Sequence, residues 1–202
     1  MNLAIIKYNA GNIRSVVNAL ERLGVTAEVT DDPHKITSAD KVIFPGVGEA
    51  SSAMESLRAA HLDEVIPLLK QPVLGICVGM QLLCTHSEEN DTKCLGIIPV
   101  KVKRFQPLAD LHNKQLRLKV PQVGWNTIYS LRSSLFRGVL ESSFVYNVHS
   151  YYVADTEYSI AKCDYGIQYA AAIKKENFYG VQFHTEKSAG VGDQIIKNFL
   201  DL

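Results

Sequence analysis

The sequence predicts an α/β fold with an open, mostly parallel central sheet, helices on both faces and additional antiparallel strands. Two patterns lead to this expectation. Short apolar runs alternate with amphipathic helical segments in the N-terminal part of the chain, as in successive strand and helix units. The apolar run 72–76 also leads through Cys77 directly into a second apolar segment with helical spacing. The length of 202 residues fits one domain spanning 1–202.

The N-terminal elements follow from their apolar spacing. Residues 2–7 form the first predicted strand, and residues 13–23 form a helix that ends at Gly24, a residue typical of helix C-caps. A second strand is predicted at 27–30. A third strand is predicted at 41–44, ending at Pro45.

The rest of the chain continues in the same mixed pattern. Residues 49–69 are expected to be helical with a break near His61, and residues 97–129 alternate as strands and loops do. Residues 189–200 predict a closing amphipathic helix. Further strands are expected at 143–149, 160–162, 168–174 and 179–183, of which the last two form a hairpin.

Composition excludes several classes of function. The formal net charge is zero and no block of like charge stands out, so we expect no nucleic-acid partner. Cysteines 77, 84, 94 and 163 form no C-x-x-C motif and have no histidine at ligand spacing, so neither a metal site nor a disulfide is indicated. The N-terminus carries no signal-peptide pattern, and no apolar stretch reaches membrane-spanning length. A cytoplasmic protein without a membrane partner is expected.

Cys77 is the first candidate for chemistry. Gly75 and Gly79 flank it in a G-x-C-x-G pattern, the cysteine version of a nucleophile elbow, in which small residues let strand and helix cross closely. The pKa of a free thiol is near ~8.5, and a helix N-terminus or a nearby imidazole lowers it. The N–H of Val78 would face an oxyanion on a substrate carbonyl. The alternative is a small buried core cysteine between two packing glycines.

A histidine and a carboxylate supply the partners that such a cysteine needs. The stretch 180–186 reads Gly-Val-Gln-Phe-His-Thr-Glu, a predicted strand that ends at His184 with Glu186 two residues on. A cysteine nucleophile requires a base, and the base requires an acceptor that fixes its tautomer. His184 and Glu186 suit these roles. The alternatives are a half-buried structural histidine and an acidic residue in the first turn of the last helix.

The loop Pro45-Gly46-Val47-Gly48 follows the third predicted strand at its carboxyl end, where ligands bind in open α/β sheets. Two glycines one residue apart let a backbone N–H turn outward, so this loop is a candidate oxyanion donor beside Cys77. A simple turn is the alternative. A phosphate-binding loop fits poorly, because the third glycine of a dinucleotide fingerprint is missing.

Together, G-I-C-V-G-M-Q and, about a hundred residues later, G-V-Q-F-H-T-E resemble the class I (triad) glutamine amidotransferases. Within that class the chain is similar, over essentially its whole length, to the glutaminase subunits of imidazole glycerol phosphate synthases. The stretches that carry this finer resemblance are 8–12, 45–48, 124–126, 148–151 and 177–180.

The resemblance implies the class I fold, no cofactor and a set of roles in glutamine hydrolysis. Cys77 would attack the side-chain amide, His184 would shuttle the proton and Glu186 would orient the imidazole. Val78 and either Val47 or Gly48 would form the oxyanion hole. The residues implied to hold glutamine are Gly46, Gly48, Gln81, Glu89, Ser150 and Tyr151.

The resemblance also implies a partner, which is a (β/α)₈ synthase subunit. Ammonia would be channelled to it for histidine biosynthesis, with an aminoimidazole carboxamide ribotide as by-product. Hydrolysis would be slow until the partner holds its nucleotide substrate. We expect the partner to dock over the mouth of the site at Asn12, Trp125, Tyr146 and Lys187, although these are also plausible as ordinary exposed residues.

Three positions depart from the commoner pattern of these subunits, namely Thr185 in place of proline, Gln122 in place of histidine and Lys7 in place of an acidic residue. The loop 45–48 argues against the subunits of pyridoxal phosphate synthase and anthranilate synthase, whose corresponding loops resemble G-G-E-S and G-P-G. Two alternatives remain: an amidotransferase subunit for a surface-sugar pathway, and a catalytically silent module that stabilises a partner.

Overall fold

The computed structural model describes residues 1–9, 12–106 and 118–202. In this part of the chain the central sheet has seven strands in the order β11-β12-β13-β4-β3-β1-β2. The strands from β2 to β13 are parallel to their neighbours, and β12 and β11 extend the sheet in antiparallel pairing. This confirms the predicted fold class. The strand bounds are β1 Leu3–Ile6, β2 Glu28–Thr30, β3 Lys41–Gly46, β4 Val73–Cys77, β11 Ser159–Asp164, β12 Gln168–Lys175 and β13 Phe178–Val181.

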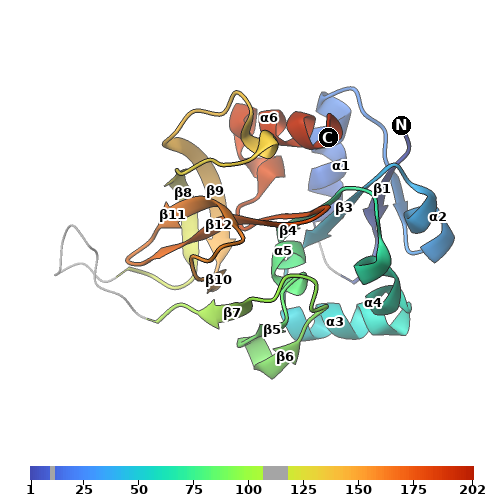
Figure 1. Cartoon of the computed structure of the whole chain (residues 1–202), viewed down its shortest axis with the longest axis horizontal. Coiled ribbons are helices and arrows are strands. Elements are labelled where there is room, and N and C mark those ends of the chain that lie inside the picture. The colour runs from blue at the N-terminus through green and yellow to red at the C-terminus, as the bar shows by residue number, and fades with distance from the viewer. Residues whose placement is uncertain (10–11, 107–117) are drawn as a thin grey trace.

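Helices cover both faces of this sheet (Figure 1). Helices α1 and α6 lie on one face, and α3, α4 and α5 lie on the other, while α2 lies beside the edge near β1. The helix bounds are α1 Ile13–Arg22, α2 Pro33–Ser38, α3 Ala50–Ala59, α4 Leu62–Val65, α5 Val78–Leu82 and α6 Ala189–Leu200.

Two smaller sheets adjoin the central one. Strands β8 (Gln122–Ile128) and β9 (Ser143–His149) form an antiparallel ribbon, called the β8–β9 ribbon below. The other sheet has the order β10-β7-β5-β6, with β5 His86–Ser87, β6 Thr92–Lys93, β7 Lys101–Arg104 and β10 Tyr151–Val153. Short 3₁₀ helices are η1 Ile66–Leu68, η2 Glu89–Asp91, η3 Ser134–Phe136 and η4 Thr185–Lys187.

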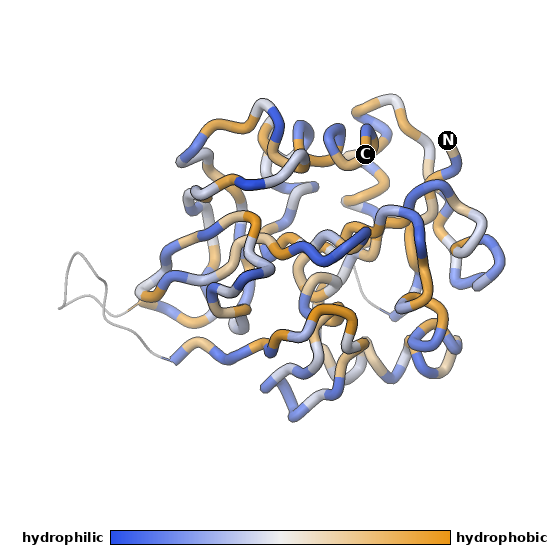
Figure 2. Tube along the Cα trace, in the orientation of Figure 1, coloured by the Kyte–Doolittle hydropathy of each residue, from blue (hydrophilic) through white to orange (hydrophobic). Residues whose placement is uncertain are grey.

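The core is built around the parallel strands. Every residue of β1, β3 and β4 is buried, as expected for strands covered by helices on both faces. Hydrophobic stretches accordingly follow much of the interior strands, and many outer loops and helices carry hydrophilic stretches (Figure 2). The carboxyl ends of β3 and β4 therefore emerge side by side at one edge of a fully packed sheet.

Several predicted element bounds were wrong, and each has a local cause. Strand β3 continues past Phe44, because Pro45 and Gly46 still pair with β4. Helix α2 was not predicted; Asp32 caps it by accepting a hydrogen bond from the His34 N–H. The break near His61 is confirmed, with φ at 55°. The last strand stops at Val181 instead of Phe183. Part of the predicted segment 97–129, residues 107–117, lies outside the described residues.

Candidate active site

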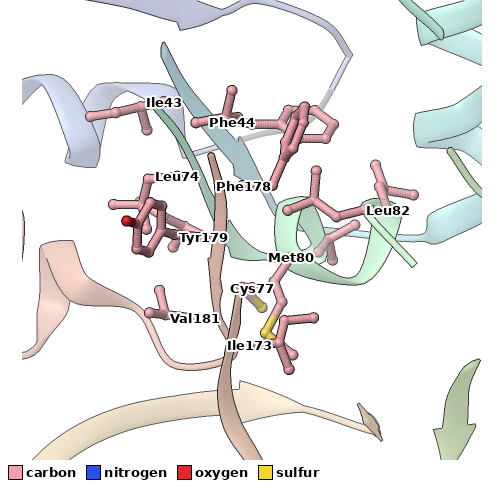
Figure 3. Packing of buried hydrophobic residues seen from close by; sticks show 14 of the residues in the cluster. Ile43, Phe44, Leu74, Cys77, Met80, Leu82, Ile173, Phe178, Tyr179 and Val181 are labelled. Atoms are coloured by element: carbon pink, nitrogen blue, oxygen red, sulfur yellow. The ribbon is translucent and has the colours of Figure 1, made fainter. Parts of the chain in front are cut away.

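Cys77 occupies the predicted elbow between β4 and α5. Its φ of 54° is unusual for a residue with a side chain, so the turn is strained. A Cβ on Gly79 would lie 1.9 Å from the Phe44 oxygen, and one on Gly75 would lie 2.8 Å from the Met80 nitrogen. Both glycines are required because backbone passes directly over them. Figure 3 shows Cys77 at this joint, with Met80 of α5 next to Ile173 of β12.

The thiol of Cys77 borders a pocket of about 550 Å³. Its Sγ lies 3.8 Å from the Val148 oxygen and, on another side, 3.8 Å from Nε2 of Gln182. The pocket is lined by Asn12, Val47, Gly48, Cys77, Val78, Gln81, Glu89, Pro121, Val148, His149, Ser150, Tyr151, His184 and Lys187. The structure therefore brings together residues that are up to 175 positions apart in the chain, from Asn12 to Lys187 (187 minus 12).

His184 and Glu186 form a buried pair beside this pocket. Nδ1 of His184 lies 2.8 Å from Oε1 of Glu186, and because a carboxylate oxygen only accepts, Nδ1 carries the proton. Nε2 of His184 is thereby left free to exchange a proton with the thiol of Cys77. Burial lowers the pKa of His184, but hydrogen bonding to Cys77 and Glu186, together with the negative charge of both, outweighs burial and raises this pKa to about 10.

Three further groups hold this pair in place. Nδ2 of Asn12 donates to the same Oε1 of Glu186 at 2.9 Å. The backbone N–H of His184 donates to the Tyr146 oxygen at 2.9 Å. Ser188 completes a ring, because its Oγ donates to the His184 oxygen at 2.6 Å and accepts from the Tyr146 N–H at 3.0 Å. The β8–β9 ribbon thus fixes the backbone of His184 on both sides.

The predicted oxyanion loop lies beside the elbow, because Gly46 of β3 pairs with Cys77 of the neighbouring strand β4. Val47 and Gly48 line the pocket together with Val78. Gly48 has φ at 95°, and a Cβ there would meet nothing within 4 Å. Gly46, in contrast, does not line the pocket: it is buried at the end of β3, where a Cβ would lie 2.5 Å from the Gly79 nitrogen. Its predicted contact with glutamine stays a prediction.

The other residues predicted to bind glutamine, Gln81, Glu89, Ser150 and Tyr151, also line the pocket. Nε2 of Gln81 donates to the Tyr151 oxygen at 3.2 Å, which fixes the strand beside Ser150. Oε2 of Glu89 accepts from the Ala50 N–H at 2.7 Å, and burial raises the pKa of this carboxyl. These residues therefore give the pocket a carboxylate and a well-supported stretch of backbone.

His149 is a site residue that the sequence analysis assigned no role. It lines the pocket, and its Nδ1 donates to the Tyr151 oxygen at 2.8 Å. Burial lowers its pKa from 6.5 to about 4, so it is neutral. The Tyr169 hydroxyl lies 3.3 Å from its Nε2. The signal in the sequence was its place in 148–151, one of the stretches that carry the resemblance, next to Ser150.

The predicted docking residues fall into two groups. Asn12 and Lys187 line the pocket. Trp125 and Tyr146 lie on the outer face of the β8–β9 ribbon, paired directly across it, with ring centroids 5.8 Å apart. Trp125 is 53% exposed.

The three residues that depart from the commoner sequence pattern, Gln122, Thr185 and Lys7, lie in different surroundings. Gln122 is buried and accepts a hydrogen bond from the Tyr169 hydroxyl at 3.0 Å, so it packs inward instead of facing a partner. Thr185 is also buried, and its Oγ1 has no hydrogen-bond partner among the described residues. Lys7 is exposed and forms an ion pair with Asp31 at 3.8 Å.

Neither a metal centre nor a membrane-spanning helix is found in the described part of the chain. In the ranges 1–9, 12–106 and 118–202, no group of three or more His, Cys, Asp or Glu side chains could hold a metal ion. No helix within those ranges has the length and apolar character needed to cross a bilayer.

The fold and the pocket define a class of protein. A cysteine in a strained turn between a parallel strand and a helix, beside a buried histidine and carboxylate pair, is the arrangement of enzymes that transfer acyl groups through a cysteine. The family described as glutamine amidotransferase class-I matches residues 4–202. A putative GMP synthase protein from Thermoplasma acidophilum has the same fold, with a TM-score of 0.74 at 18% identity, covering 100% of this chain and 93% of that one.

Relatives with higher sequence identity place the chain in one group within this family. The imidazole glycerol phosphate synthase subunit HisH of Bacteroides fragilis is 54% identical over 202 residues, covering all of both chains. HisH of Haemophilus influenzae is 45% identical over 202 residues, covering 100% of this chain and 98% of that protein. The chain therefore belongs to the class I glutamine amidotransferase family and, within it, to the HisH group. It is a glutamine amidotransferase.

Proposed function

We propose that this chain is the glutaminase subunit of an imidazole glycerol phosphate synthase and works through Cys77, His184 and Glu186. The observation that carries the proposal is the 2.8 Å contact between His184 and Glu186 at the edge of the pocket that Cys77 also lines. A base held by a carboxylate beside a strained cysteine is the requirement of nucleophilic acyl transfer. The names of the HisH relatives support the pathway.

The reaction proceeds in two halves. The sulfur of Cys77 attacks the carboxamide carbon of glutamine, and His184 gives its proton to the departing nitrogen, so that the C–N bond breaks and ammonia leaves a thioester. Water then attacks the thioester carbon and gives a proton to His184. The C–S bond breaks and glutamate is released. The N–H of Val78 and one N–H from Val47 or Gly48 stabilise the oxyanion in both halves.

Glutamine is held by its amino acid moiety in the part of the pocket that Glu89, Gln81, Ser150 and Tyr151 line. The Glu89 carboxylate suits the α-ammonium group, because one of its oxygens accepts from Ala50 and leaves the other for a ligand. Gln81, Ser150 and Tyr151 complete this part of the site. Gly46 and Gly48 contribute through the backbone.

The ammonia passes to a (β/α)₈ synthase subunit that docks over the pocket mouth. The outer face of the β8–β9 ribbon supports this proposal, because its exposed side chains are apolar and aromatic. Val123, Trp125 and Phe144 are each more than half exposed. Lys187 and Asn12, which line the pocket, provide polar contacts at its rim.

The test of the catalytic role is Cys77→Ser in the complex with the synthase subunit. We expect glutamine-dependent synthesis to be lost, while synthesis from added ammonium continues at the wild-type rate. Loss of both activities would mean that Cys77 is structural. Full glutamine use would mean that the proposed nucleophile is wrong.

The docking surface is tested with Tyr146→Ala and Lys187→Ala. Each substitution is expected to weaken either binding of the synthase subunit or the stimulation of glutamine use by that subunit. The free energy of unfolding of the isolated chain should change by no more than about 0.5 kcal/mol, as is usual for surface substitutions. Unchanged titration calorimetry together with unchanged glutamine use in the complex would contradict the proposed surface.

Regulation is proposed to act through the Val47–Gly48 peptide. The open surroundings and positive φ of Gly48 let this peptide rotate at low steric cost, turning an oxyanion donor in or out. One missing donor lowers turnover by about 10²–10³-fold. The nucleotide ligand of the partner should therefore raise kcat more than it lowers KM for glutamine. A change confined to KM would refute this mechanism.

A further inference from the structure

Gln182 is a buried amide side chain to which the proposed reaction assigns no task. It lies between the end of β13 and His184 and is fully buried. Its backbone N–H donates to the Ala171 oxygen at 2.8 Å, so its position is fixed by the sheet. Its side-chain Nε2 lies 3.8 Å from Sγ of Cys77. A buried polar group in contact with the reacting atom calls for a chemical role.

The orientation of this amide follows from its neighbours. The backbone oxygen of Tyr151 can only accept, so the Gln81 atom that contacts it at 3.2 Å must be the amide nitrogen. The same nitrogen contacts the Gln182 amide at 3.1 Å, so the Gln182 atom there must be the oxygen. The nitrogen of Gln182 is then the atom that faces Sγ. Two amides in series thus aim a donor at the sulfur.

We propose that Gln182 is a further catalytic residue, whose side-chain N–H donates to Sγ of Cys77 and stabilises the ionised sulfur. A hydrogen bond to a charged acceptor is stronger than one to a neutral acceptor, and it gains further inside a protein, where the dielectric is low. His184 provides the positive charge on one side of the sulfur. Gln182 provides a neutral donor that stays in place after His184 has given its proton away.

A chain of hydrogen bonds also links the sulfur of Cys77 to the backbone of Tyr151, which lines the pocket. Tyr151, Gln81, Gln182 and Cys77 follow one another through hydrogen bonds of 3.2, 3.1 and 3.8 Å. This part of the inference rests on the proposed function, because the wall at Gln81 and Tyr151 is where glutamine is held. A bound glutamine that displaced the Gln81 amide would free Gln182 to turn away from Sγ. The proposal therefore requires that the hydrogen bond from Gln81 to Gln182 stays in place when glutamine binds.

The test measures ionisation of Cys77 without using glutamine. The full-length chain is alkylated with iodoacetamide across pH 5 to 10, a range of about five units around an ordinary thiol, and modification at Cys77 is followed by mass spectrometry. Cys84, Cys94 and Cys163 are also present and buried, so the modified site must be identified. In Gln182→Met, which has similar size and no donor, we expect the midpoint of the pH profile to rise by about one unit, giving ~10-fold slower alkylation on the acidic side.

The matched control is Asn198→Leu. Asn198 is another buried amide, whose Nδ2 donates to the Leu135 and Arg137 oxygens at 2.9 and 2.8 Å in a part of α6 that does not line the pocket. The Asn198→Leu variant should lose about as much unfolding free energy as Gln182→Met, but its pH profile of Cys77 alkylation should stay as in the wild type. An equal shift in both variants would show that Gln182 acts only through stability and would overturn the proposal.

A second variant covers the case in which Gln182→Met does not fold. Gln182→Leu also lacks a donor and carries no charge, so the midpoint should again rise by about one unit. An unchanged midpoint in a folded Gln182 variant would overturn the inference while leaving the proposed function intact. Full glutamine use by Cys77→Ser would overturn the proposed function instead.

Discussion

The two halves of the candidate site are built in opposite ways. The elbow half comes from one continuous stretch of chain, 73–82, and is fixed by backbone atoms that touch Gly75 and Gly79 at distances too short for a side chain. The base half is assembled from three separate segments: Asn12, Tyr146, and the stretch from His184 to Ser188. Side-chain and backbone hydrogen bonds hold it together.

This difference indicates which half can respond to a partner. Moving the elbow would require the central sheet to deform, because β3 and α5 are in direct contact there. The base half is attached to the β8–β9 ribbon, whose Tyr146 backbone bonds to His184 and whose outer face carries Trp125, so a shift of this ribbon would act on the base. We therefore expect the elbow to be a rigid platform and the base half to be adjustable.

The largest effect is expected at the elbow. In Gly79→Ala the new Cβ would lie 1.9 Å from the Phe44 oxygen, a backbone atom that cannot move away, so the variant should not give a stably folded chain. Gly190→Ala is the matched control, since a Cβ there meets nothing within 4 Å. Thermal unfolding of both variants measures the difference. Equal stability would contradict the view of the elbow as a rigid, tightly packed joint.

The next effect concerns catalysis in the base half. His184→Ala removes the proposed base, whereas Glu186→Gln keeps a group that can still accept from Nδ1 and should leave residual turnover. We expect kcat for glutamine to fall by about 10²–10⁴-fold in Glu186→Gln and further in His184→Ala. Steady-state kinetics of the complex, with ammonium-dependent synthesis as the control, provide the measurement. Wild-type rates in both variants would refute the assignment of the pair.

The same contrast explains what could be predicted from the sequence. The elbow, its two glycines and most of the parallel strands were predicted, because their signals are local: apolar runs, glycine spacing and a cysteine between them. The contact of Asn12 with Glu186 spans 174 positions, and no periodicity reports on it. His149 and Gln182 were missed for the same reason. Each was visible in a quoted motif, but its role depends on which backbone carbonyl or sulfur the fold brings beside it.

A pH-dependent effect on stability is expected from His149. In the folded chain the pKa of His149 is lowered to about 4, whereas in the unfolded chain it is near 6.5, so the unfolded state binds more protons between these values. The contribution is therefore present above pH 6.5 and is lost as the pH falls toward 4. It amounts to about 3 kcal/mol.

His149→Gln isolates this contribution. Glutamine keeps a donor for the Tyr151 oxygen and does not titrate, so the loss of unfolding free energy between pH 6.5 and 4 should be smaller in the variant than in the wild type. Denaturant unfolding at a series of pH values measures the two slopes. If the unfolding free energies of the two proteins change in parallel with pH, His149 is protonated in the folded protein between pH 6.5 and 4.

The smallest effect concerns Asn12, which the sequence analysis assigned to the partner surface. The structure gives it a second contact, because Nδ2 donates to Oε1 of Glu186 at 2.9 Å while its Oδ1 accepts from the Ser15 hydroxyl. Asn12 has φ at 79°, so glycine is the substitution that removes the amide without straining the backbone. Glu186 keeps its bond to His184 in Asn12→Gly but loses one of the two donors on Oε1.

We expect Asn12→Gly to lower kcat for glutamine by about 10-fold, the equivalent of ~1.4 kcal/mol, with KM nearly unchanged. Asn12→Asp tolerates the same backbone conformation but places a carboxylate oxygen against Glu186, so it should lower kcat further. Both variants are measured in the isolated chain and in the complex. If the isolated chain keeps the wild-type kcat and only partner binding weakens, Asn12 belongs to the docking surface alone, and the base half is held from the β8–β9 ribbon without help from α1.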